Sequence, residues 1–484
     1  MITVVGLGPG SIEDLSLRAW GKLQDTNSLY VRTRRHPCVA HLPSHLDIVS
    51  FDKVYEALDD FEDVYREISD RLLATARAGI DLVYAVPGDP LVGEASVTRL
   101  AQQARAEGLE VEIVNGISFI EPCLALLGID ALDGLQIFDA LEVAAQYHPP
   151  INPAKPALLA QVYNQSVASN LKLTLMNQYP DDFAVKLVHS AGQDESLVEA
   201  LCLYEIDRSD KIDVMTSLYV PALGPLSSFE SFQEIIARLR SPEGCPWDQE
   251  QTHQSLRPFL IEETYEVLDA LDSEDPTALY EELGDLLLQI VLHAQIAVDD
   301  GEFFMSEILQ HVNHKMIRRH PHVWGDVDVE GDPSRVASNW EDIKRSEQIS
   351  TGAEERSLLD GVPKGAPALL VAHQYSKRAS KVGFDWPDAS GVEQKAREEF
   401  DEIFTAAGLA EKTQEIGDLI FVLVNWLRWL GVDDPESLLR EINAKFYRRF
   451  AFVEARARQN RGALSDYSLD ELDEFWQAAK RAGL

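Results

Sequence analysis

The sequence predicts a multidomain protein, in which an N-terminal α/β domain is followed by two all-α helical-bundle domains. Up to about residue 223, short apolar segments that end in glycine turns alternate with helical segments, as in α/β proteins. After the linker candidate GPLSS (224–228) the pattern is helical throughout. An acidic helix pair at 261–291 then returns near 398–424. The length of 484 residues fits about three domains.

Composition excludes several classes of function. The net charge is −38 and the pI is near 4.6, which argues against a broad nucleic-acid surface and against docking on anionic membranes. No apolar run reaches the ~18 residues of a membrane span. Four scattered cysteines without a C-x-x-C pair indicate neither zinc nor a disulfide framework, and they suit a reducing cytoplasm: Cys38, Cys123, Cys202 and Cys245.

Three predicted strands of the α/β domain end in glycine turns. The strand ITVV (2–5) runs into Gly6-Leu7-Gly8-Pro9-Gly10, the strand at 81–86 into PGDPLVGE (87–94), and the strand VEIV (111–114) into NGIS (115–118). Such turns present backbone N–H groups at the carboxyl edge of a sheet, so one ligand crevice is expected there. Helices are predicted at 14–22, 61–78 and 95–107.

These glycine turns resemble the tetrapyrrole methylase family of S-adenosylmethionine-dependent methyltransferases. TRRHP (33–37), SFDKVYEALDDFEDVY (50–65) and TSLYVPAL (216–223) resemble a subgroup fused to a nucleotide pyrophosphohydrolase. The resemblance implies a domain over residues 1–223 with S-adenosylmethionine between the strand-end loops. It places cofactor binding on Pro9, Gly88, Asp89, Val92 and Ser118. Ser11 departs from the family, where an acid is common. His36 suits either a base or a loop histidine.

The first helical domain opens with a helix at 232–239 and the loop GCPWDQEQTH (244–253). Trp247 in this loop suits either stacking on a base or anchoring the packing. Two helices then follow over 261–291, joined by a polar turn at 272–276.

The helix pair carries a set of spaced acids. Glu262, Glu263 and Glu266 stand at i, i+1 and i+4, and Glu282 and Asp285 stand at i and i+3. Asp285 leads into LLLQIVL, which is apolar nearly all round and is expected to be buried. Carboxylates that converge at a core edge repel one another, and Mg²⁺ relieves that cost. A solvated acidic helix face is the alternative interpretation.

Acidic and basic blocks recur in the same order and at a nearly constant spacing, which indicates an internal duplication. Glu398, Glu399 and Glu402 repeat the first acids, and Glu415 and Asp418 repeat the second. The matching basic blocks are Asn313, Lys315, Arg318 and Arg319, and Asn443, Lys445, Arg448 and Arg449. The predicted domains are 229–347 and 361–484, joined by a polar link at 348–360. The basic side chains suit phosphate oxygens or ion pairs with a neighbouring acidic helix.

These two units resemble the all-α MazG nucleotide pyrophosphohydrolase family, through CPWDQEQTH, EETYE, EELGD and KMIRRHPHVWG and their second-copy counterparts. The resemblance implies Mg²⁺-dependent hydrolysis of nucleoside triphosphates to monophosphate and pyrophosphate. It places metal binding on Glu263, Glu266, Glu282 and Asp285, and on Glu399, Glu402, Glu415 and Asp418. Phosphate contacts fall on Lys315, Arg319, Lys445 and Arg449. Glu262 or Glu398 is the expected base that orients the attacking water.

Three alternative hypotheses stay open at the level of sequence. The helical half regulates a methyltransferase, or it senses nucleotides without turnover, or one copy is a structural partner of the other. A homodimer or an intrachain pairing of the two copies is expected, because paired acidic helices complete their bundle against a second copy.

Overall fold

The computed structural model describes residues 1–58, 60–350, 357–460 and 462–484. These form two compact units, Met1–Gln310 and His311–Leu484, and the division falls within helix α12 (Met305–Arg319). Of the predicted link at 348–360, residues 351–356 lie outside the described residues. The domain limits 1–223, 229–347 and 361–484 stay predictions.

The first sheet of unit 1 is wholly parallel, with the strand order β3-β2-β4-β1-β5. Strand β1, which lies between β4 and β5, is buried along its whole length, as expected for a parallel strand that is covered on both faces. The bounds are β1 (Ile2–Gly6), β2 (Ser28–Val31), β3 (Asp47–Ser50), β4 (Leu82–Val86) and β5 (Val111–Val114). Because β4, β1 and β5 are neighbours, their carboxyl ends meet at one edge, as the sequence predicts.

Helices α1 (Leu17–Gln24), α2 (Asp52–Ala57), α3 (Phe61–Arg77) and α4 (Ala95–Ala106), with 3₁₀ helices η1 (Ile12–Asp14) and η2 (Pro37–His41), accompany this sheet. The side chains of Ile68, Leu72, Tyr84 and Leu100 fill one core. The helix predicted from residue 14 begins at Leu17 instead. Ser16 has an extended backbone and caps the helix at this point, because its side chain accepts a hydrogen bond from the N–H of Ala19.

The second sheet of unit 1 is mixed, with the order β6-β7-β10-β8-β9. Only β6 and β7 pair in parallel, and the other pairs are antiparallel. The strands are β6 (Gln136–Asp139), β7 (Ala157–Ala160), β8 (Ala184–His189), β9 (Leu197–Cys202) and β10 (Thr216–Val220). The associated helices are α5 (Ile120–Leu127), η3 (Ala131–Asp133), α6 (Ala140–Ala144), α7 (Gln165–Leu175) and η4 (Leu203–Arg208).

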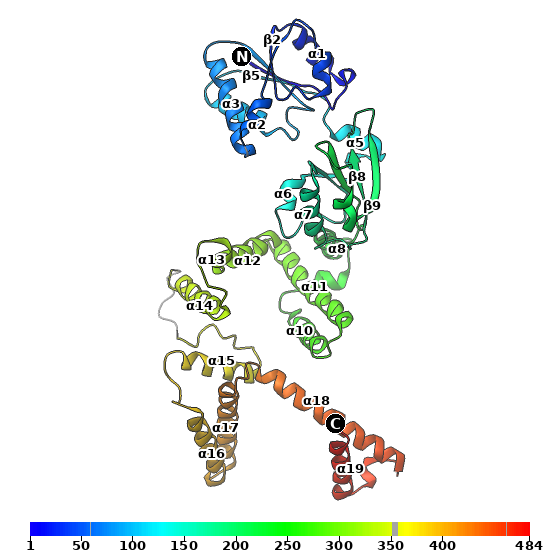
Figure 1. Ribbon diagram of the computed structural model, residues 1–484. Helices are drawn as coiled ribbons and strands as arrows, with labels where there is room; N and C mark the ends of the chain where they lie inside the picture. Colours follow the sequence, from blue (N-terminus) through cyan, green and yellow to red (C-terminus); the bar gives the residue numbers. More distant parts are fainter. Residues whose placement is uncertain (59, 351–356, 461) are drawn as a thin grey trace. The chain divides into compact units, whose positions relative to one another are not determined.

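The remaining elements are helical in both units, as predicted. In unit 1, α10 lies along α11, and in unit 2, α16 lies along α17 (Figure 1). The elements of unit 1 are α8 (Phe229–Arg240), α9 (Pro246–Glu250), α10 (Arg257–Asp272) and α11 (Pro276–Asp300). Those of unit 2 are α13 (Pro321–Trp324), α14 (Pro333–Ser350), α15 (Ala368–Ser380), α16 (Ala389–Thr405), α17 (Leu409–Trp429), α18 (Pro435–Asn460), η5 (Leu464–Asp466) and α19 (Leu469–Arg481).

No described helix combines the length and apolarity needed to cross a membrane.

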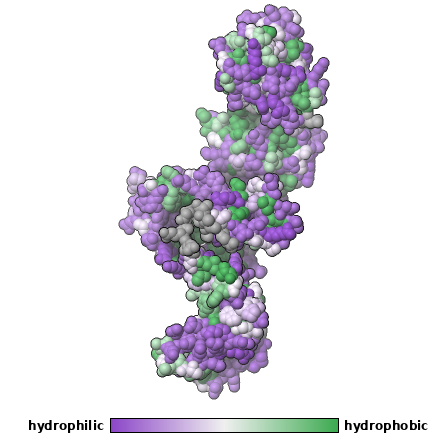
Figure 2. Space-filling model, turned by 90° about the vertical axis from the view of Figure 1, so that its left-hand side faces the viewer, coloured by the Kyte–Doolittle hydropathy of each residue, from purple (hydrophilic) through white to green (hydrophobic). Residues whose placement is uncertain are grey.

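The expectation that the run LLLQIVL is buried is only partly correct for the single chain. Asp285 is exposed, Leu287 is 39% exposed and Ile290 is 44% exposed, whereas Gln289 is buried. Val291 and Leu292 of α11 pack in a core that this helix shares with α8. Another apolar stripe of α11 is left uncovered. On the face shown in Figure 2, patches of hydrophobic residues interrupt a mostly hydrophilic surface.

We predict that Gly116→Ala destabilises the first sheet by about 2 kcal/mol, the range typical of overpacking. A Cβ at Gly116 would lie 2.5 Å from the Gly88 carbonyl oxygen, so the strand-end loops must separate. Hydrogen–deuterium exchange should quicken in β1, β4 and β5. The control is Gly224→Ala, where a Cβ meets nothing within 4 Å. Equal protection in the two variants would contradict the prediction.

Candidate functional site

The acids predicted to bind metal in the first copy converge across a helix pair. Glu263 and Glu266 share a face of α10, and Glu282 comes from the first turns of α11. One carboxylate oxygen of each residue lies within 4.8 Å of the others. Glu262, the predicted base, is exposed on α10 beside this group. We call Glu263, Glu266 and Glu282 the first acidic cluster.

Crowding of like charges is visible in the electrostatics of the first acidic cluster. Desolvation, followed by the charges of Asp285 and Glu266, raises the pKa of Glu263 above its ordinary value. Desolvation and the same two charges raise the pKa of Glu282. Asp285 is therefore close enough to act on the cluster, although its own oxygens lie outside the group of three. Such repulsion favours either protonation or a bound cation.

The second copy repeats this arrangement. Oxygens of Glu399 and Glu402 on α16 and of Glu415 on α17 lie within 4.8 Å of one another, and we call them the second acidic cluster. Desolvation, followed by the charges of Glu402, Glu399 and Asp418, raises the pKa of Glu415. Glu399 is buried, so this copy encloses one carboxylate more fully than the first copy does.

Lys395 distinguishes the second copy, and the sequence analysis missed it. Its Nζ lies 2.7 Å from Glu398 Oε1 and 2.8 Å from Glu399 Oε1, and these two hydrogen bonds raise the pKa of the lysine. In the first copy the matching position, three residues before Glu262, holds Phe259. The spacing of Lys395 from Glu398 and Glu399 could have predicted these ion pairs, because residues three and four apart on a helix are neighbours. The second acidic cluster therefore contains a resident cation.

The predicted phosphate-binding arginines already have protein partners. Arg319 pairs with Glu347 at 2.7 Å, lowers the pKa of that acid to about 2, and lies 4.7 Å from the ring centre of Trp340. Arg449 donates to the Leu484 carbonyl oxygen at 2.6 Å and lies 5.8 Å from the ring of Trp476. The alternative of an ion pair is thus realised for Arg319, although its partner helix α14 carries equal numbers of acidic and basic residues.

The predicted phosphate-binding lysines are half-buried. Lys315 lies on α12 and Lys445 lies on α18. Lys315 and Arg319 belong to unit 2, whereas the first acidic cluster belongs to unit 1. Between described residues, no ion pair joins Lys445 or Arg449 to the second acidic cluster.

An aromatic cavity of about 560 Å³ lies in the second copy, and the sequence did not predict it. Tyr375, Phe384, Trp386 and Phe421 supply its apolar walls, and Asn425 is among its polar groups. The other polar groups include Asp385, which accepts hydrogen bonds from Arg428 at 2.6 Å and from the indole of Trp429 at 3.2 Å. Trp386 thus lines a cavity that combines flat rings with an amide.

Trp247, at the matching position of the first copy, lies edge-on to Phe259 with ring centres 5.9 Å apart. It is 52% exposed, so it is only partly a packing anchor.

In the α/β domain, the first two glycine turns line a crevice of about 220 Å³, together with Phe119, which follows the third turn. Gly8 and Gly88 bond each other through their backbones, and a Cβ at Gly6 would lie 2.6 Å from the Gly88 carbonyl oxygen. Of the predicted cofactor residues, Pro9, Gly88 and Val92 line the crevice. Such closely approaching backbone loops fit a ligand that binds main-chain groups.

Asp89 and Ser118 are buried and brace the loops behind the crevice. Asp89 accepts hydrogen bonds from the Asn115 side chain at 3.0 Å and the Gly116 N–H at 3.2 Å. Ser118 donates its hydroxyl to Glu121 at 2.5 Å. A cofactor role for these two residues stays a prediction.

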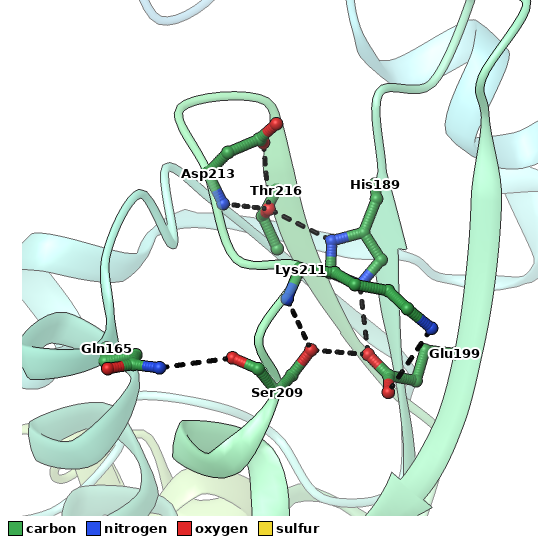
Figure 3. Close-up of polar contacts among 7 residues, drawn as sticks. All are labelled: Gln165, His189, Glu199, Ser209, Lys211, Asp213 and Thr216. Carbon is green, nitrogen blue, oxygen red and sulfur yellow. Dashed lines mark hydrogen bonds and ion pairs between the residues drawn. The ribbon is translucent and has the colours of Figure 1, made fainter.

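The opposite wall of the crevice comes from the second sheet, which the sequence analysis did not connect with the site. Gln161, at a φ of 66°, and Thr216 lie there. Figure 3 shows how a polar network holds this wall: Thr216 Oγ1 lies 3.2 Å from His189 Nδ1, and His189 Nε2 lies 3.3 Å from Glu199. Asp213 closes the turn, since its N–H donates to Thr216 Oγ1. No glycine motif marks this wall, so its role emerges only from the fold.

Two protein families match separate parts of the chain. Residues 1–207 match the Tetrapyrrole (Corrin/Porphyrin) Methylases, and residues 251–324 match the MazG nucleotide pyrophosphohydrolase domain.

Individual relatives extend these matches. The chain is 42% identical over 488 residues to the uncharacterized protein YabN of Bacillus subtilis (strain 168), covering 99% of this chain and 98% of that protein. It is 44% identical over 252 residues to the nucleoside triphosphate pyrophosphohydrolase/pyrophosphatase MazG of Thermotoga maritima, covering 52% of this chain and 95% of that protein. A solved structure, uroporphyrin-III-C-methyltransferase from Thermus thermophilus, is 21% identical with a TM-score of 0.36, covering 46% of this chain and 93% of that one.

We predict that Lys395→Gln tightens divalent-metal binding at the second acidic cluster roughly fivefold, the equivalent of ~1 kcal/mol for a half-exposed ion pair. The metal no longer has to displace the ammonium group from Glu398 and Glu399. Titration with Mn²⁺, followed by electron paramagnetic resonance, measures the affinity. The control is Arg397→Gln, because Arg397 pairs with Glu393 outside the cluster. Unchanged or weaker binding in Lys395→Gln would show that the lysine does not compete.

Proposed function

The chain belongs to the family of proteins that join a tetrapyrrole methylase domain to MazG nucleotide pyrophosphohydrolase domains. From that premise we propose that it hydrolyses nucleoside triphosphates to monophosphate and pyrophosphate at a magnesium site. The observation that carries the proposal is the pair of acidic clusters, each with three carboxylate oxygens within 4.8 Å. The Thermotoga relative is named for the same reaction class.

The donor set fits Mg²⁺. All the predicted ligands are carboxylates, which hard divalent cations prefer. Desolvation, followed by the charges of neighbouring carboxylates, raises the pKa of Glu263, Glu282 and Glu415, and a bound cation would offset both effects. Asp285 and Asp418 complete the two proposed sets. When bound, Mg²⁺ supplies charge neutralisation for the triphosphate and polarises a water molecule.

The protein residues would then orient the reactants. Glu262 and Glu398, each next to a ligand on its helix, are the proposed bases that align water with the α-phosphorus. Glu398 forms an ion pair with Lys395. In the proposed reaction, the lysine moves to a phosphate of the substrate, and Glu398 is then free to act as the base. Lys315 and Lys445 supply cations to the phosphate tail, and Arg319 and Arg449 do so by exchanging their present partners.

The aromatic cavity around Trp386 supports a base-binding role for the second copy. Its flat rings suit stacking, and Asn425 offers both a donor and an acceptor to a base edge. Trp247 is the proposed counterpart in the first copy, where it is exposed enough to stack.

We also propose that the α/β domain binds S-adenosylmethionine and transfers its methyl group. The support is the crevice between closely approaching glycine loops, where Pro9, Gly88 and Val92 face the ligand and Asp89 and Ser118 fix the loops. The acidic surface and the four free cysteines suit a cytoplasmic enzyme that does not bind nucleic acid or membranes.

A homodimer is the proposed assembly, because the two copies leave the same apolar stripe uncovered. Leu283, Leu287 and Ile290 of α11 are 49%, 39% and 44% exposed. Ile416, Ile420 and Leu423 of α17, at the matching positions, are 47%, 47% and 42% exposed. Like surfaces exposed at equivalent positions are suited to self-complementary pairing.

We predict that Glu266→Ala and Glu402→Ala, made separately, each remove at least ~100-fold of the activity of their own copy, because even the partners of metal ligands contribute 10–100-fold. Ion-exchange analysis after incubation with each nucleoside triphosphate and Mg²⁺ should show monophosphate and pyrophosphate. Glu67→Ala, on a surface ion pair of α3, is the control. Orthophosphate with a remaining diphosphate would contradict attack at the α-phosphorus, and full activity of the double variant would remove the metal assignment.

We predict that Leu287→Glu combined with Ile420→Glu turns the dimer into a monomer, since each change places a charge in the apolar stripe. Light scattering coupled to size-exclusion chromatography measures the mass. The control is Leu173→Glu, a residue 60% exposed on α7 outside the stripe. A monomeric wild-type chain would instead favour intrachain pairing of the copies.

A further inference from the structure

His36 is a buried titratable group that the proposed reactions do not yet use. It follows β2 in the segment TRRHP, is 8% exposed and lines the crevice together with Pro9 and Gly88. Its Nδ1 has no hydrogen-bond partner among the described residues. A buried acceptor that is left unpaired costs free energy, so the atom is suited to a ligand that supplies a donor.

The partner of the other ring nitrogen fixes which atom carries the proton. His36 Nε2 lies 3.0 Å from the carbonyl oxygen of Gly8. A carbonyl oxygen only accepts, so Nε2 carries the hydrogen and donates it. In the neutral ring, Nδ1 then holds a lone pair. Desolvation lowers the pKa of His36 below its ordinary value despite the hydrogen bond to Gly8, so the ring is neutral at pH 7.

Arg32 is the one arginine or lysine among the described residues that line the crevice, and it is already neutralised. Its guanidinium lies 2.6 Å from Glu94, whose side chain is 2% exposed, and its Nε donates to Tyr55 at 2.8 Å. Glu94 is held in turn by the hydroxyl of Ser96 at 2.7 Å. A crevice whose cation is satisfied internally is poorly matched to a ligand with many carboxylates.

We propose that His36 is the general base for methyl transfer to an uncharged N–H or O–H acceptor, rather than to a carbon atom of a polycarboxylate macrocycle. The proposal rests on the proposed binding of S-adenosylmethionine in the same crevice. Gly8, which fixes the tautomer, is next to Pro9 in the loop that faces the methyl donor. The base is therefore held by the same loop that positions the cofactor.

The step balances without a further reactant. The acceptor nitrogen or oxygen forms a bond to the methyl carbon, and the sulfur–methyl bond breaks with its electron pair going to sulfur, which leaves S-adenosylhomocysteine. The acceptor proton passes to Nδ1 of His36 and then to water. Because Nδ1 is unprotonated and desolvated in the free protein, it is ready to take that proton.

The experiment compares the wild-type chain with His36→Gln, in which the amide accepts a hydrogen bond but takes no proton. His41→Gln is the control, because His41 is exposed on η2. Tritiated-methyl S-adenosylmethionine is supplied with amide-capped peptides, nucleosides or uroporphyrinogen III, a macrocycle with carboxylate side chains. Calorimetry measures the binding of S-adenosylmethionine to each variant.

We expect label on a nitrogen or oxygen of a peptide or nucleoside, a loss of about 100-fold in His36→Gln, and equal affinity for S-adenosylmethionine in all three proteins. The wild-type rate should fall at acid pH, where Nδ1 becomes protonated, and this fall should be absent from the residual activity of His36→Gln. In the wild type, ¹⁵N shifts at pH 7 should show hydrogen on Nε2 and none on Nδ1.

Label on uroporphyrinogen III, no label on any peptide or nucleoside, an undiminished rate in His36→Gln, or hydrogen on Nδ1 would each overturn the inference about His36. A wild-type chain that does not bind S-adenosylmethionine would instead overturn the proposed methyltransferase function, so the two failures are distinguishable.

Discussion

Repulsion between carboxylates that are held together across paired helices is the constraint on which the helical half depends. Helix α10 carries Glu263 and Glu266 on one face, and α11 brings Glu282 against them. The fold thus concentrates charge where isolated helices would keep it apart. Desolvation and the neighbouring carboxylates raise the pKa of Glu263 and Glu282, so the charged state of the first acidic cluster is costly. A divalent cation and a nucleotide's phosphate tail are the partners that would relieve it.

The two copies meet this constraint differently. In the second copy, Lys395 neutralises part of the charge from within the chain. In the first copy the corresponding residue is Phe259, and among the described residues no ion pair joins a lysine or arginine to the first acidic cluster. The aromatic cavity at Trp386 adds a further difference. The duplication therefore preserved the acids while their surroundings diverged, which is a physical basis for unequal roles of the two copies.

In the α/β domain, the constraint that shapes the candidate site is the close approach of backbone segments. Gly6, Gly88 and Gly116 bring three strand ends so near one another that a Cβ on Gly6 or Gly116 would collide with the Gly88 carbonyl oxygen. The resulting crevice is small, and a second sheet closes it. His36 and Arg32 both line this crevice, although neither belongs to a glycine motif. The Pro9 loop, the candidate base His36 and the paired Arg32 thus line one crevice.

By itself, the sequence determined the order of an α/β part and a helical part, the junction of three glycine turns and the recurrence of the acids. These follow from short-range rules, because helix periodicity places Glu263 with Glu266 and parallel strands align their carboxyl ends. Only the tertiary structure decided that Leu287 and Asp285 stay exposed, that Lys395 occupies an acidic cluster, and that His36 lines a crevice while its buried Nδ1 has no hydrogen-bond partner among the described residues. The burial and pairing of side chains depend on which distant segments pack together, and the local sequence pattern does not specify that packing.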